Sequence, residues 1–109
     1  MAATPSATTL VAEAATHLRH AAAAARQLGG RDAFSIWSAF AGQLDLAAAG
    51  LDPMWLGHDE PDSASIRDHL AAAASAIDRI APLEGPPDLA MWVWHLSELK
   101  RIAEQMGAP

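Results

Sequence analysis

Proton transfer is the first chemistry that this chain suggests, because a histidine stands beside two tryptophans and close to a carboxylate. His95 follows Trp92 and Trp94, and Glu98 comes three residues later. On a helix, residues three apart share a side, so Glu98 could hold one ring nitrogen of His95. Histidine side chains ordinarily titrate near neutrality, which suits them to act as an acid or a base. His95 and Glu98 are therefore the candidate catalytic residues.

The two tryptophans also indicate a binding surface. They are two residues apart, which places them about 200° apart around a helix axis. Only one of them can face a bundle core. Trp92 continues a repeat through Leu96 and Leu99, so we assign it to the core and expect Trp94 to point outward, with Met91. Three roles stay open for Trp94: packing on a neighbouring helix or under an arginine, anchoring a dimer interface, or lining a small-molecule pocket.

The other histidines of the predicted helices form no recognisable metal motif. His17 and His20 share one side of the first predicted helix, and His69 flanks the seam of the third. Dimetal sites in helical bundles need a Glu-x-x-His run on two helices, whereas this chain has only the reverse order, at His95 and Glu98. The chain has no cysteine, hence no thiolate ligand or thiol nucleophile. We expect these histidines at the boundary between core and solvent, and we predict no metal site and no cofactor.

The charge balance disfavours two classes of partner. Among 109 residues, 7 are basic and 13 are acidic, which gives a formal net charge of −6. Nucleic acid binding needs clustered Lys and Arg, so we expect neither nucleic acid nor a membrane as a partner. No apolar run is long enough to span a bilayer, and the first residues lack a signal-peptide pattern, so we expect a cytoplasmic protein. Abundant alanine, with arginine preferred to lysine, resembles the composition of proteins from GC-rich bacteria.

Four segments of the chain show the apolar periodicity of helices. Apolar residues recur at intervals of three and four at about residues 9–28, 33–49, 63–81 and 87–106. Gly29 and Gly30 end the first segment, and Asp32 is the expected N-cap of the second. Asp62 or Ser63 is the expected N-cap of the third.

Four helices with two short turns and one longer connection predict an all-α fold. We expect a single domain over residues 1–109, built as an antiparallel four-helix bundle in up-down-up-down order. The longer connection contains Met54 and Trp55, which we expect to fold back over one end of the bundle. Alanine buries little area, so large side chains must supply most of the core. They are Phe34, Trp37, Phe40, Trp55, Trp92, Trp94 and the leucines and isoleucines.

The first functional hypothesis is a non-catalytic binding protein that is homodimeric. Its surface would use Met91, Trp94 and Ile102, with Met54 and Trp55 at one end. The occupant of that surface would be a second copy of the chain, an apolar small molecule or another protein.

The second hypothesis is a small cofactor-free enzyme of the lyase, isomerase or cyclase type. Small alanine side chains between large aromatic ones can leave a pocket for an apolar substrate. His95 would act as the acid or base in this cavity, oriented by Glu98. The predicted lining is Trp37, Phe40, Trp55 and Trp92. An enclosed cavity beside His95 would favour the enzyme, and its absence would favour the binding protein.

Overall fold

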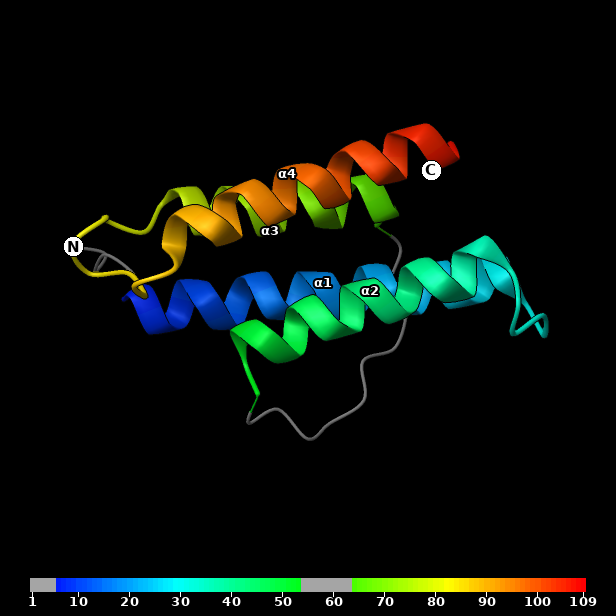
Figure 1. Cartoon of the computed structure of the whole chain (residues 1–109), viewed down its shortest axis with the longest axis horizontal. Coiled ribbons are helices and arrows are strands. Elements are labelled where there is room, and N and C mark those ends of the chain that lie inside the picture. Colours follow the sequence, from blue (N-terminus) through cyan, green and yellow to red (C-terminus); the bar gives the residue numbers. More distant parts are fainter. Residues whose placement is uncertain (1–5, 54–63) are drawn as a thin grey trace.

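The structure is a computed structural model that describes residues 6–53 and 64–109. These residues form four α-helices, as the apolar periodicity predicts. They are α1 (Ala7–Gly29), α2 (Ile36–Leu51), α3 (Ile66–Asp78) and α4 (Leu89–Met106). Figure 1 shows them as one bundle of elongated helices. Among the described residues, no helix is long and apolar enough to cross a membrane.

Serine residues cap the first three helices. The hydroxyl oxygens of Ser6, Ser35 and Ser65 each accept a hydrogen bond from the backbone N–H three residues later. Each hydroxyl thereby satisfies one of the backbone donors that a helix start leaves without an intrahelical partner. The prediction of Asp32 as the cap of α2 is wrong. Its carboxylate instead accepts from the backbone N–H of Phe34, within the turn that precedes the helix.

The sequence also predicted the end of the first helix and the start of the third. Gly30 has a φ of 60° and donates its N–H to the carbonyls of Arg26 and Gln27, so the predicted glycine stop of the first helix is confirmed. The predicted caps of the third helix, Asp62 and Ser63, lie outside the described residues.

The helices do not alternate in direction along the chain. The N–H of Arg67 donates to the carbonyl of Pro109 over 3.0 Å, so α3 begins beside the end of α4. Trp92 packs against Gly50, so α2 ends beside the start of α4. Helices α2 and α3 therefore both run opposite to α4, as Figure 1 shows, and the expected up-down-up-down order is wrong. The end of α2 and the start of α3 lie at opposite ends of the bundle, as Figure 1 shows.

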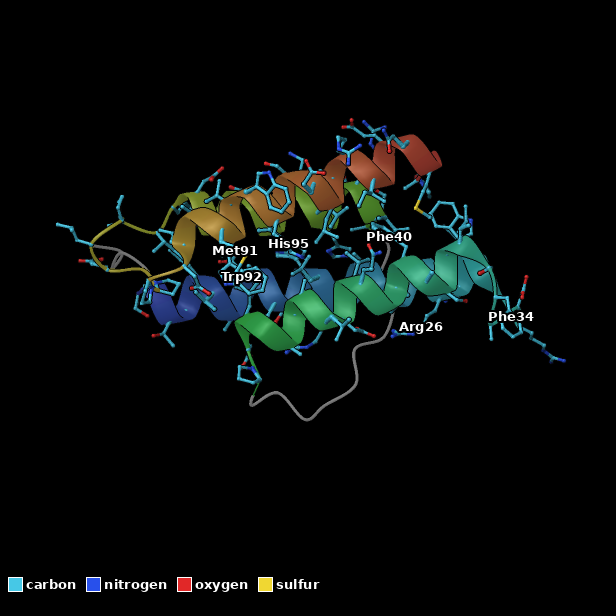
Figure 2. The ribbon with its side chains drawn as sticks, in the orientation of Figure 1. Arg26, Phe34, Phe40, Met91, Trp92 and His95 are labelled. Carbon is cyan, nitrogen blue, oxygen red and sulfur yellow. The ribbon has the colours of Figure 1, made fainter. Side chains whose placement is uncertain are left out.

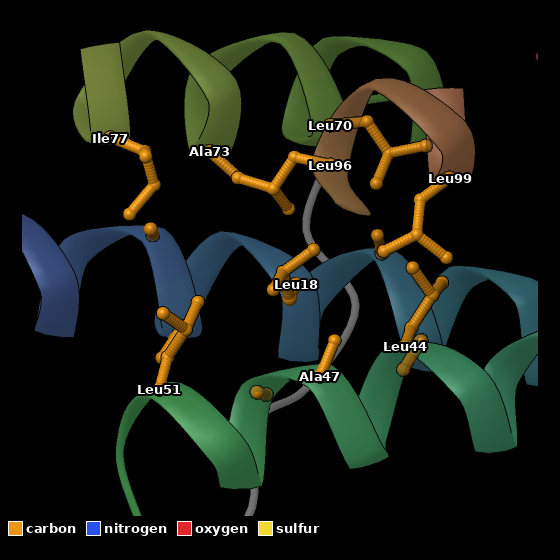
Figure 3. Close-up of a cluster of buried hydrophobic side chains, with 14 of the residues drawn as sticks. Leu18, Leu44, Ala47, Leu51, Leu70, Ala73, Ile77, Leu96 and Leu99 are labelled. Carbon is orange, nitrogen blue, oxygen red and sulfur yellow. The ribbon is translucent and has the colours of Figure 1, made fainter. Parts of the chain in front are cut away.

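Helix α1 joins the two halves of the bundle. It packs against α2 and α3, and α3 packs in turn against α4. Alanines dominate the buried side of α1 and allow its neighbours to approach closely; the buried residues are Leu10, Ala14, Ala15, Leu18, Ala21, Ala22 and Ala25. Leucines from all four helices then fill the space between them, among them Leu18, Leu44, Leu70 and Leu96 (Figure 3).

The predicted aromatic core is present in part. Phe40 and Trp92 are buried, and Trp37 is partly buried against the core. Phe34 was expected in the core but is 98% exposed. The reason is local: Phe34 precedes the cap of α2, so the helical period that would turn it inward has not yet begun. Trp55 lies outside the described residues.

Candidate functional site

A groove runs between α2 and α4, which do not pack extensively against each other. It has a volume of about 280 Å³ and an almost entirely apolar wall. The lining residues are Gln43, Leu46, Ala47, Met91, Trp92 and His95. Figure 2 shows Met91, Trp92 and His95 together on the first half of α4. The groove is open to solvent rather than enclosed.

Trp92 forms the floor of the groove and is held from two sides. Its indole Nε1 donates to the carboxylate of Asp88, one turn earlier, over 3.2 Å. The edge of its ring lies so close to Gly50 that a Cβ there would stand 2.8 Å from a ring carbon. The glycine therefore permits the contact that joins α4 to the end of α2. The prediction that Trp92 faces the core is confirmed, because it is 9% exposed.

His95 lies on the groove wall without the carboxylate partner that the sequence suggested. Its ring meets Trp92 edge-on, with centroids 5.7 Å apart and ring planes at 83°. The carboxylate of Glu98 instead accepts from Arg101, at 2.6 Å from Nη2 and 3.0 Å from Nε. A carboxylate prefers this two-pronged cationic donor to a neutral imidazole.

The same ion pair explains the shifted titration of Arg101. The hydrogen bond to Glu98, and secondarily the negative charge of Glu98, raise the pKa of Arg101 above its ordinary value. The carboxylate of Glu98 therefore bonds to Arg101, and it forms no pair with His95.

Large apolar side chains stand exposed on α2 and α4: Leu46 and Met91 line the groove, whereas Trp94 is not among its lining residues. Leu46 on α2 is 76% exposed, while Met91 and Trp94 on α4 are 46% and 62% exposed. The outward direction of Trp94 is as predicted. Within the described residues Trp94 makes no ring contact with another aromatic side chain, and Arg101 is turned toward Glu98. Of the three roles left open for Trp94, packing on a neighbouring helix or under an arginine therefore gains no support from these contacts.

The remaining predicted site residues do not gather at the groove. Phe40 lies near the other end of α2 from Gly50, about 15 Å along the helix axis (Figure 2). Trp37 shares that end, so an aromatic cavity that joins it to Trp92 is not formed. Ile102 is partly buried against the core. Met54 and Trp55 lie outside the described residues.

The outward side of α2 was not predicted from the sequence. Its exposed residues carry no charge; they are Ile36, Ala39, Gly42, Gln43, Leu46, Ala49 and Gly50. The one charged residue of α2, Asp45, pairs sideways with Arg26 of α1. The signal was available, because several of these positions repeat at intervals of three and four beside the buried stripe. The sequence does not tell whether a second apolar stripe faces the core or the solvent. The exposure of these side chains in the structure decides it.

Comparison with known proteins gives no relative: the chain matches no family model, no curated protein and no solved structure. Function is therefore inferred from the groove and the apolar surface around it.

Proposed function

We propose that this protein is a non-catalytic interaction protein that forms a homodimer through the surface between α2 and α4. We call this surface the dimer face and define it by Gly42, Leu46, Met91 and Trp94, together with the groove between the two helices. The observation that carries the proposal is the exposure of large apolar side chains on both sides of one groove. Contiguous exposed apolar surface is uncommon on monomers and typical of interaction sites.

Gly42 gives further support to a close-packed partner. A Cβ at this position would meet nothing within 4 Å, so no contact inside the chain requires a glycine there. Glycine in a helix interior costs about 0.5–1 kcal/mol relative to alanine. Gly50, in contrast, accommodates Trp92. If a helix of another molecule packed closely against α2, Gly42 would leave room for it, as Gly50 leaves room for Trp92.

Charge does not oppose a second copy at the dimer face, although it does elsewhere on the surface. Each chain carries a net charge of −6, so two copies repel each other over most of their surfaces. The outward side of α2 is free of charged residues, and Glu98 on α4 is balanced by Arg101. Two copies that meet at the dimer face would bring no unpaired carboxylates together there, while their remaining charge stays in water.

The enzyme hypothesis has less support. It needs an enclosed cavity beside His95 and a carboxylate that orients the ring. His95 lies instead on an open groove, and Glu98 is engaged by Arg101. A general acid or base without an orienting partner or exclusion of water lacks two sources of catalytic efficiency. We therefore assign His95 to the wall of the binding groove.

Light scattering coupled to size-exclusion chromatography tests the dimer. The wild-type protein should show twice the chain mass, and Leu46→Lys should shift it to the monomer, because a lysine would place a desolvated charge in the interface. Leu83→Lys is the matched control. It makes the same change at a fully exposed leucine in the turn between α3 and α4, and it should leave the mass unchanged. A monomeric wild type, or equal behaviour of the two variants, would overturn the homodimer.

A further inference from the structure

A second hollow lies at the end of the bundle where α1 and α4 begin and α2 ends (Figure 1). It has a volume of about 360 Å³, and its walls come from these three helices and from the turn between α3 and α4. We call it the end pocket. Trp92 is the one lining residue that it shares with the groove of the dimer face. Among its lining residues are Val11, Leu51, Glu84, Pro86, Asp88 and Trp92.

Apolar side chains supply much of the lining of the end pocket. Leu51 and Trp92 are each 9% exposed, and Val11 of α1 is partly buried against the core. An apolar ligand body could lie on these side chains, because removing such surface from water is favourable. The indole ring of Trp92 adds a second attraction, since the face of an aromatic ring carries negative charge density and attracts cations.

Two carboxylates line the same pocket. Asp88 stands at the N-cap position of α4, but its side chain makes no capping hydrogen bond. It accepts instead from the indole Nε1 of Trp92 over 3.2 Å, so its charge lies beside the tryptophan. Within residues 6–53 and 64–109, no basic side chain pairs with Asp88 or Glu84, and none lines the pocket. The end pocket therefore combines apolar surface with negative charge.

The helix ends around the end pocket do not reverse this charge. Helices α1 and α4 begin at this end of the bundle, whereas α2 and α3 end there (Figure 1). A helix carries about half a positive charge at its N-terminus and about half a negative charge at its C-terminus, so two of each nearly cancel. The two carboxylates then decide the sign of the potential. An anion would be repelled, and a neutral ligand would leave the carboxylates without a counter-charge.

We propose that the end pocket binds a small organic cation, an ammonium group on an aromatic body. The ammonium group donates hydrogen bonds to the carboxylates of Glu84 and Asp88, and the aromatic body packs on Trp92 and Leu51. Hydrogen bonds between charged partners are stronger than neutral ones, so the carboxylates select the charge while the apolar side chains supply buried area. The inference does not depend on dimer formation, because one chain supplies every lining residue.

Binding of 2-phenylethylammonium tests the proposal. Proton–nitrogen NMR follows the indole N–H of Trp92, whose signal is identified among those of the four tryptophans by its loss in Trp92→Phe. We expect this signal to shift in a saturable way. The neutral counterpart 2-phenylethanol should bind roughly threefold to tenfold more weakly, because it lacks the charge. No saturable shift of the Trp92 signal up to about 10 mM ligand, or equal affinity for the two compounds, would overturn the proposal.

Charge-removing variants assign the binding to the end pocket. Asp88→Asn keeps an oxygen that can accept the indole N–H of Trp92, so it removes the charge while preserving that contact. Glu84→Gln removes the other charge at an exposed position. Each should weaken binding of 2-phenylethylammonium roughly threefold to tenfold and leave binding of 2-phenylethanol nearly unchanged.

Asp32→Asn is the matched control. It makes the same change of net charge in the turn between α1 and α2, at the other end of the bundle, and should leave the affinity unchanged (Figure 1). Wild-type affinity in both pocket variants, or an equal loss in Asp32→Asn, would mean that overall charge rather than the end pocket attracts the cation. Light scattering on the same samples reports the oligomeric state separately, so failure of the homodimer and failure of the end pocket are distinguishable.

Discussion

Trp92 lies against Gly50 so closely that the contact exists only because residue 50 has no side chain. This pair joins the start of α4 to the end of α2, two helices that do not pack extensively against each other. Trp92 also lines the groove, whereas Gly50 is not among its lining residues.

Gly50→Ala should destabilise the protein. The added Cβ would stand 2.8 Å from a ring carbon of Trp92, and the ring is held on its other side by Asp88. Overpacking of this kind costs about 1–3 kcal/mol. Gly42→Ala is the matched control, since its Cβ meets no atom of the chain and the better helix former should add about 0.5–1 kcal/mol. Urea unfolding compares the two under conditions where the chain is monomeric. Equal effects would mean that Trp92 does not depend on Gly50.

Trp94→Ala should separate folding from association. The side chain is 62% exposed and contributes little to the core of its own chain, so the unfolding midpoint of the monomer should be nearly unchanged. Self-association should weaken, because exposed tryptophans commonly anchor interfaces. Sedimentation equilibrium measures the dissociation constant directly. A loss of monomer stability with unchanged association would assign Trp94 to the fold instead.

Ser35→Ala should cost more stability than Asp32→Ala. The hydroxyl of Ser35 accepts the N–H of Ser38 at the start of α2, and the loss of such a cap costs about 1 kcal/mol. The carboxylate of Asp32 bonds to Phe34 in an exposed turn outside the helix. Ser97→Ala, at an exposed position within α4, controls for the loss of a hydroxyl. A larger effect of Asp32→Ala in thermal unfolding would restore Asp32 as the cap.

Glu98→Gln should have a small effect that does not change between about pH 6 and about pH 10. The partner Arg101 has a raised pKa because of its bond to Glu98, so its contribution is complete below the ordinary arginine value and is lost only at more alkaline pH. Exposed ion pairs contribute little, so the change should be near the limit of detection. A pH-dependent loss in this range would indicate that Glu98 acts on His95 instead.

The sequence predicted features that depend on helical period alone. Four apolar repeats gave four helices, Gly30 ended the first one, and the spacing of Trp92 and Trp94 turned one inward and the other outward. These properties follow from 3.6 residues per turn and from backbone capping, and both are local. Where the local rule had two candidates, it failed: Asp32 and Ser35 are both good caps, and Phe34 lies just before the helix whose pattern it seemed to begin.

Only the tertiary structure decides between residues or helices that are equally possible partners by sequence. Glu98 has His95 and Arg101 at the same spacing, and only the orientation of the side chains decided for Arg101. The direction of α3, the contact of His17 with His69, and the distance of Phe40 from Trp92 depend on which helices lie side by side. That order is set by the sum of packing over all the interfaces, and a periodic sequence with a long connection permits more than one order. The residues on each helix face were therefore determined by the sequence, and which faces meet was decided by the fold.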